Sequence, residues 1–280
     1  MRVNSSHRLL FDGGTSVPFL ETPNKHGTLA GGKPKYIIIH YTASGSANSA
    51  INVFRNPSHR ASAHLVLGHD GAITQMARLN EKCWHAGQSR WGGLTGLNSH
   101  SVGIEIANWG WLEGGNGNWK SHVGTRVDDS RVIEATHRNG GRFLGWEIYD
   151  EAQVTTCADM VRAIADRYEL GPEHVLGHDD ISPLRKQDPG PAWHMEKFRS
   201  FVFGRSDDTG DVELRYQVSS ATGLNLRNGP GVAHDVIKLL SDNTEVLQIE
   251  SNGAWWLVSE LVGGDADITG WVHSNWLRRM

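Results

Sequence analysis

Runs of apolar, β-branched residues alternate with amphipathic segments over roughly the first 200 residues. The segment KYIIIHYTAS is continuously apolar from Tyr36 to Ile39, which predicts a buried strand. The segment AHLVLGHDGAITQM alternates around Asp70-Gly71 and predicts a hairpin. HSVGIEIAN predicts another buried strand, and EHVLGHDD predicts a short strand that runs into a loop.

Three segments carry helical signals. Ser49 to Arg55 is weakly helical, Asp150 to Tyr168 has apolar residues at helical spacing, and Trp193 to Phe203 predicts a final amphipathic helix. The Gly- and Trp-rich stretch from Trp109 to Asn118 reads as a long loop. Strands interleaved with helices predict a mixed α/β fold with a central mixed β-sheet flanked by helices.

The pattern changes after residue 203. Gly204 to Asp211 is polar and lacks periodicity, so it predicts a linker. The short strand signals that follow predict a small all-β barrel, and they are ELRYQV, LNLR, VIKLL, TEVLQIE, AWWLVSE and GWVHSNWL. We therefore expect one domain over 1–203, a linker over 204–211 and a second domain over 212–280.

Composition excludes several classes of protein. Hydrophobic residues make up 38% and charged residues 21%, as in ordinary globular proteins, and the net charge of −4 gives no electrostatic case for a nucleic-acid partner. No apolar run is long enough to insert into a membrane. The N-terminal MRVNSSHRLLFDGG has no apolar core of a secretory signal. We expect a protein made in the cytoplasm that leaves by another route, or a sequence without its leader.

The two cysteines cannot form a zinc finger or a disulfide framework. Cys157 lies on an apolar stripe with Val154, Val161 and Ile164, which favours a buried thiol. A bridge between Cys83 and Cys157 stays open as the alternative.

The 15 histidines raise the question of a metal. His40 and His178 each follow a predicted buried strand, and strand ends converge at one edge of a sheet. Asp188 stands ten positions after His178 and offers a carboxylate, although it could equally be a solvated loop acid. Lys186 lies two residues before Asp188, so an extended segment would project both side chains to the same side.

Other histidine pairs fit a metal less well. In a strand, the side chains of His174 and His178 would lie roughly 13 Å apart, too far to share an ion. His64 and His69 point to opposite faces of a regular strand. Ordinary solvated or hydrogen-bonded roles are favoured for most of the remaining histidines: His7, His26, His59, His122, His137, His194, His234 and His273.

Five motifs in order resemble the zinc-dependent N-acetylmuramoyl-L-alanine amidases, whose fold is shared with peptidoglycan recognition proteins. They are IIIHYTA, SAHLVLGHDGAITQ, WHAGQS, SVGIEIAN and GHDDISPLRKQDPG, and the resemblance runs from about Pro23 to about Phe203. It implies an enzyme that cleaves the amide bond between N-acetylmuramic acid and L-alanine of the peptidoglycan stem peptide.

The resemblance also implies roles for individual residues. One Zn2+ per chain would be bound by His40, His178 and Asp188. A zinc-activated water would attack the scissile carbonyl, with Glu105 as general base and Lys186 stabilising the oxyanion. Without the other motifs, Glu105 would be read as a strand glutamate exposed on the far face.

The WHAG stretch of this family lines the substrate groove, which makes four residues candidates for substrate binding: Trp84, His85, Ala86 and Gly87. For His85 the alternative is a structural histidine that holds the loop.

The C-terminal part resembles bacterial SH3-like domains through LNLRNGPG and GWVHSNWL. Two roles stay open for it, binding of cell-wall peptide or glycan and packing without a ligand.

The partners implied are peptidoglycan and its muropeptides. The setting expected is that of a phage lysin or a secreted antibacterial effector acting in the periplasm or outside the cell, and a wall-recycling enzyme stays open as a third setting. One alternative function is a non-catalytic peptidoglycan recognition protein of the same fold. Another is a metallopeptidase that cuts elsewhere in the stem peptide.

Overall fold

The computed structural model of the 280-residue chain describes residues 1–115, 117–204, 215–252, 254–263 and 265–279. The chain divides into two compact units, Met1–Ser206 and Asp207–Met280. Apart from Gly204, the predicted linker lies outside the described residues. Within the described ranges, no helix combines the length and the apolar character that a membrane span requires.

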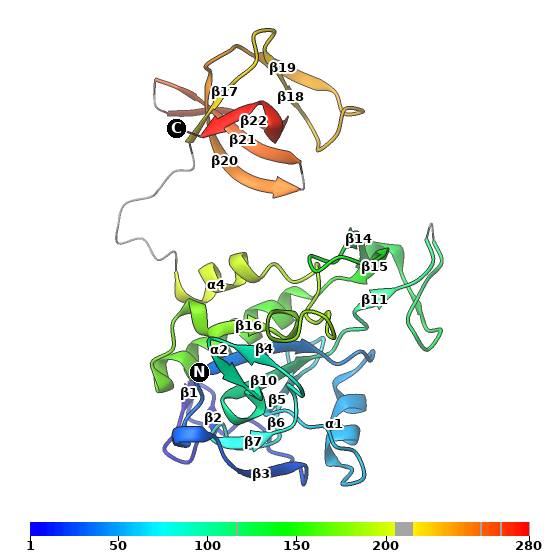
Figure 1. Ribbon diagram of the computed structural model, residues 1–280, viewed down its shortest axis with the longest axis vertical. Coiled ribbons are helices and arrows are strands. Elements are labelled where there is room, and N and C mark those ends of the chain that lie inside the picture. The colour runs from blue at the N-terminus through cyan, green and yellow to red at the C-terminus, as the bar shows by residue number, and fades with distance from the viewer. Residues whose placement is uncertain (116, 205–214, 253, 264, 280) are drawn as a thin grey trace. The chain divides into compact units, whose positions relative to one another are not determined.

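A five-stranded mixed sheet forms the centre of the first unit (Figure 1). Its strands, in the order in which they lie side by side, are β16 (Val175–Gly177), β4 (Tyr36–Tyr41), β10 (Ser101–Ile106), β5 (Leu65–Leu67) and β6 (Ile73–Gln75). The first four are parallel, and β6 pairs antiparallel with β5 through the predicted hairpin. The predicted mixed sheet is confirmed.

The three predicted helices are present, with starts that differ by one or two residues. They are α1 (Ala47–Arg55), α2 (Glu151–Tyr168) and α4 (Met195–Phe203). Helix α2 begins after Asp150, whose side chain and that of Gln153 form a capping box. Glu169 then ends the helix in the left-handed conformation.

The two faces of the sheet have different surroundings. Ile37, Ile39 and Ile104 belong to the largest core cluster, which includes the apolar faces of α2 and α4. Side chains alternate along a strand, so Ile38, His40 and Glu105 lie on the opposite face. Glu105 is the direct partner of His40 in the register of β10 and β4. The face turned away from α2 therefore receives both polar side chains at neighbouring positions.

The predicted loop from Trp109 to Asn118 is wrong in part. Trp111–Leu112 forms strand β11, which pairs with β15 (Phe143–Glu147), and β15 pairs with β14 (Val132–Thr136) in a separate three-stranded antiparallel sheet. A strand of two residues has no readable periodicity, and its pairing partner lies more than thirty positions away along the chain.

The predicted strand over EHVLGHDD is also shorter than expected. Strand β16 ends at Gly177, and His178–Ile181 forms the single helical turn α3. The Asp180 carboxylate accepts a hydrogen bond from the backbone N–H of Gly177 at 2.7 Å, which caps this turn. The ligand candidate His178 is thus the first residue of a capped turn.

The first unit also contains several short elements. The strands are β1 (Arg2–Val3), β2 (Leu9–Leu10), β3 (Lys25–Thr28), β7 (Glu81–Cys83), β8 (Arg90–Trp91), β9 (Leu94–Thr95), β12 (Trp119–Lys120) and β13 (Arg126–Val127). The 3-10 turns are η1 (Ala30–Gly32), η2 (Leu97–Ser99), η3 (Asp129–Arg131) and η4 (Pro172–His174).

Cys83 and Cys157 are both free and buried, so the alternative of a disulfide bridge is wrong.

The second unit is all β, as predicted. Its seven-stranded antiparallel sheet has the order β19-β18-β22-β21-β20-β17-β23. The strands are β17 (Arg215–Val218), β18 (Leu224–Arg227), β19 (Val236–Leu240), β20 (Glu245–Asn252), β21 (Trp255–Val262), β22 (Asp265–His273) and β23 (Leu277–Arg279). The 3-10 turn η5 (Ser274–Trp276) splits the predicted strand GWVHSNWL. A small core of valines and leucines holds this unit together.

Candidate functional site

Three side chains predicted as metal ligands meet at the carboxyl ends of the parallel strands. Nδ1 of His40 lies 2.8 Å from Oδ2 of Asp188 and 3.0 Å from Nδ1 of His178, and Nδ1 of His178 lies 2.9 Å from the same carboxylate oxygen. All three residues are buried. Within the described residues, this is the cluster of histidine and carboxylate side chains whose ligand atoms converge closely enough to hold a metal ion.

The fold explains why residues so distant in sequence converge. His40 lies near the end of β4, and His178 follows β16, which pairs with β4 in parallel. The loop after α3 then folds back, so that the backbone N–H of Asp179 donates to the carbonyl oxygen of Asp188 at 2.9 Å. Because the loop folds back in this way, the Asp188 carboxylate lies next to the imidazoles of both His40 and His178.

The hydrogen-bond contacts of His178 suit a metal ligand. Its Nε2 lies 3.1 Å from the carbonyl oxygen of Ala86 and 3.3 Å from Nη2 of Arg185. The two hydrogens on Nη2 are used in shorter bonds to the carbonyl oxygens of Ala86 (2.9 Å) and Gln88 (3.0 Å). Nε2 of His178 therefore donates to Ala86, and a neutral ring with its hydrogen on Nε2 has its lone pair on Nδ1, the atom next to the Asp188 carboxylate.

The charges of the other two groups also fit a cation. Burial, followed by the proximity of His178, lowers the pKa of His40 to about 4, so its ring is neutral at pH 7. Burial acts to raise the pKa of Asp188, but the adjacent His178 and His40 rings outweigh burial and hold this pKa below its ordinary value. Two imidazole nitrogens and one carboxylate that converge on a common point are a donor set for a divalent metal such as zinc.

Glu105 lies beside this cluster on β10 and contributes to the same cavity. Burial raises its pKa well above the ordinary value, and the nearby Asp188 carboxylate adds to this effect while Lys186 opposes it. A carboxylate with a raised pKa holds protons more strongly, which suits it to accept and return a proton near neutral pH.

A cavity of about 810 Å³ opens over the cluster. His40, Glu105, His178, Lys186 and Asp188 all contribute to its wall, so the structure brings together every residue predicted as a ligand or a catalytic group. The fully exposed Leu184 lies on the same loop at the cavity.

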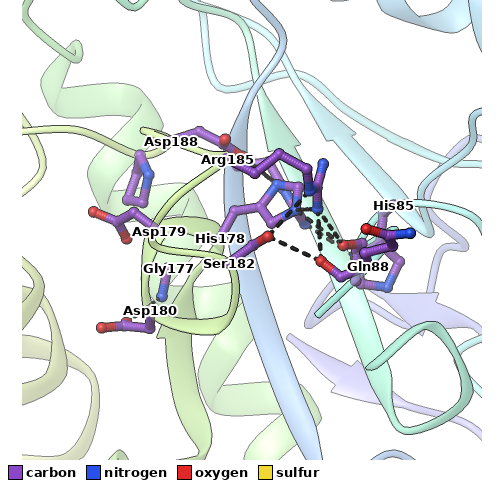
Figure 2. A network of polar contacts seen from close by, with 12 residues as sticks. His85, Gln88, Gly177, His178, Asp179, Asp180, Ser182, Arg185 and Asp188 are labelled. Atoms are coloured by element: carbon purple, nitrogen blue, oxygen red, sulfur yellow. Dashed lines mark hydrogen bonds and ion pairs between the residues drawn. The ribbon is translucent and has the colours of Figure 1, made fainter. Parts of the chain in front are cut away.

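The four residues of the WHAG stretch differ in exposure and in their relation to the cavity. Of these four, His85 borders the cavity, and it is buried with an exposure of 8%. The exposed Gly87 has a φ of 55°, and Nη2 of Arg185 would lie 3.1 Å from a Cβ at this position. The turn thus packs closely against the metal-binding loop. Figure 2 shows Arg185 and Ser182 of that loop directed at Gln88, whose carbonyl oxygen accepts hydrogen bonds from both.

Sequence reasoning missed one wall of the cavity. His137, Asn139, Gly140 and Gly141, in the loop between β14 and β15, contribute to the lining. This loop is bound to α3: Nε2 of His137 donates to the Asp179 carboxylate at 3.0 Å, and the amide of Asn139 donates to the Asp179 carbonyl oxygen at 3.1 Å. The polar, Gly-rich stretch HRNGG could have marked a loop, but nothing in it points to α3.

Comparison with known proteins agrees with this geometry. Residues 30–191 match the family model described as N-acetylmuramoyl-L-alanine amidase. The N-acetylmuramoyl-L-alanine amidase AmiD of Escherichia coli (strain K12) is 29% identical over 187 residues, which cover 64% of this chain and 57% of AmiD. The 1,6-anhydro-N-acetylmuramyl-L-alanine amidase AmpD of the same organism is 31% identical over 143 residues, which cover 51% of this chain and 59% of AmpD.

The matched regions span less than two thirds of either relative. Among solved structures, that of a selenomethionine AmpD derivative matches with a TM-score of 0.50 at 23% identity, covering 69% of this chain and 99% of that one. This match shows that the fold is shared.

Proposed function

The chain belongs to the N-acetylmuramoyl-L-alanine amidase family, and we propose that it hydrolyses the amide bond between N-acetylmuramic acid and L-alanine in peptidoglycan. The observation that carries this proposal is the convergence of His40, His178 and Asp188 beside Glu105 in one cavity. A non-catalytic recognition protein of the same fold would need neither a complete ligand set nor a carboxylate next to it. The substrate class makes the cell wall the place of action.

The metal in this proposal is zinc, one ion per chain, bound by Nδ1 of His40, Nδ1 of His178 and a carboxylate oxygen of Asp188. Zinc in such a donor set lowers the pKa of water and polarises a carbonyl group. Elemental analysis of His178→Ala tests the assignment, because losing one of three ligands should remove the metal at stoichiometric concentration. Full zinc content in that variant would remove His178 from the site.

Glu105 is the general base and acid. Its position beside His40 in the strand register puts its carboxylate next to the ligand cluster, and its raised pKa favours proton transfer near neutrality. The proton taken from water is then returned to the amine that leaves as the amide bond breaks. Lys186, on the cavity wall, supplies a positive charge for the oxyanion of the tetrahedral species.

Digestion of purified peptidoglycan followed by mass analysis of the products tests the reaction. The proposal expects free stem peptides that begin with L-alanine, together with glycan strands of unchanged length. Cuts inside the stem peptide would indicate a metallopeptidase instead. Binding of muropeptide without any product would indicate a recognition protein.

The second unit, which we propose to be an SH3-like domain, binds cell-wall material. Support comes from a cavity of about 290 Å³ whose wall includes Arg227, Trp255, His273 and Trp276. Trp276 is 52% exposed and brings an aromatic ring to this wall, a kind of side chain that contacts sugars and peptides.

Co-sedimentation of the full chain with purified sacculi tests this role of the second unit. Trp276→Ala should weaken binding, whereas Ile249→Ala should not, because Ile249 is similarly exposed at 53% but lies outside the cavity wall. Equal binding by both variants would favour a packing role without a ligand.

A further inference from the structure

The protonation of the His85 ring is fixed by its contacts with Ser101. Nε2 of His85 lies 3.3 Å from the carbonyl oxygen and 3.4 Å from the hydroxyl oxygen of Ser101. That hydroxyl donates its own hydrogen to the carbonyl oxygen of Leu97 at 2.7 Å, so both atoms beside Nε2 are acceptors. Nε2 of His85 therefore carries the ring hydrogen, and Nδ1 of the neutral ring has a lone pair.

This lone pair faces the ring of His40. Nδ1 of His85 lies 3.0 Å from Nε2 of His40, so Nε2 of His40 is the donor in this pair. A neutral imidazole that donates from Nε2 has its lone pair on Nδ1. Nδ1 is the atom of His40 that meets Asp188 and His178 in the ligand cluster. The contact with His85 thus selects the form of His40 that can bind a metal.

The next residue of the same turn has the corresponding effect on His178, whose Nε2 donates to the carbonyl oxygen of Ala86 at 3.1 Å. Asn98 holds both parts of the turn, because its Oδ1 accepts from the backbone N–H of His85 at 3.0 Å and from that of Ala86 at 2.7 Å. One turn therefore orients both imidazoles of the cluster.

The space for the His85 ring depends on Gly103 in β10. A Cβ atom at position 103 would lie 2.5 Å from Cγ of His85 and 2.6 Å from its Nδ1, far inside van der Waals contact. The glycine of SVGIEIAN is therefore explained by the approach of His85 to the sheet. It lies two residues before Glu105 on the same face of the strand.

From these contacts we infer that His85 is a positioning residue of the metal site, which acts through His40 rather than by binding substrate. Outer-shell partners of this kind fix the tautomer and the orientation of a ligating histidine. The inference rests on the proposed metal site and adds to it a role for the WHAG turn.

A matched pair of variants separates hydrogen bonding from packing. Asn and Leu side chains have similar size and shape, but only Asn offers an acceptor oxygen close to the position of Nδ1. In the full chain, chelator competition should show that His85→Leu binds zinc about 10–100-fold more weakly than the wild type. His85→Asn should bind within about threefold of it.

The chelator titration distinguishes failure of the role proposed for His85 from failure of the proposed metal site. Equal zinc affinities of the Asn and Leu variants would overturn the role of His85, because loss of packing alone affects both variants alike. A wild-type chain that binds no zinc would overturn the proposed metal site, and the role of His85 with it.

A second measurement uses the wild type, so it does not depend on the folding of any variant. Nitrogen-15 NMR of the zinc-loaded chain reports which ring nitrogen of each histidine carries hydrogen. The inference expects His85 to be protonated on Nε2 and bare on Nδ1. A hydrogen on Nδ1 of His85 would overturn it.

Discussion

Replacement of Glu105 by Gln separates chemistry from metal binding. The amide keeps the size of the carboxylate and its place on β10, but it cannot accept a proton. Glu105 is not part of the three-residue ligand cluster, so Glu105→Gln should keep its zinc and its affinity for muropeptide.

The expected loss follows from the environment of the carboxylate. Burial and the Asp188 charge raise the pKa of Glu105, which brings its basicity closer to neutral pH. Removing such a general base should lower turnover on the order of 10²–10⁴-fold. This loss corresponds to about 2.7–5.4 kcal/mol of transition-state stabilisation.

The assay compares turnover of a soluble muropeptide, zinc content and equilibrium binding for the wild type and two variants. Glu134→Gln is the matched control, because Glu134 is an exposed strand glutamate that does not line the cavity. It should behave as the wild type in all three measurements. Turnover of Glu105→Gln close to that of the wild type, with zinc retained, would refute the assignment of the base.

Three further predictions test other parts of the molecule. Lys186→Ala should keep its zinc and lose about 10²–10³-fold in turnover through lost oxyanion stabilisation, and unchanged turnover would exclude that role. Residues 1–206 alone should fold and cleave soluble muropeptide but act more weakly on intact sacculi, because the cluster lies in the first unit; a folded but inactive fragment would argue against this division. Burial lowers the pKa of His64 from 6.5 to about 4. Between these pH values the unfolded chain therefore binds a proton at this residue that the folded chain does not bind. Urea titrations should therefore show the free energy of unfolding falling by about 3 kcal/mol from this residue as pH drops from 6.5 to 4, and a constant value would contradict it.

The strands and helices of the first unit were predictable where the hydrophobic pattern was long enough to show its period. β4, β10 and α2 are examples, since each extends over at least six residues with a continuous or periodic apolar pattern. Strand β11 was not predictable, because its two residues acquire their structure from pairing with β15. The helical turn α3 was missed because it depends on the cap that Asp180 provides.

The sequence by itself determined which residues could bind a metal. His40 lies near the end of one buried strand and His178 follows another, and parallel strands end at one edge of a sheet, so their convergence follows from local pattern and chain topology. The loop with its carboxylate at Asp188 belongs to the same local segment as His178, ten positions away.

Only the tertiary structure decided how those ligands are held. The sequence favoured a groove role for His85 and left a structural role open, because a ring nitrogen takes its role from the atom that it meets. Its partners His40 and Ser101 lie 45 and 16 positions away in the chain. Burial, tautomer and pKa depend on such distant neighbours, which the local pattern of residues does not encode.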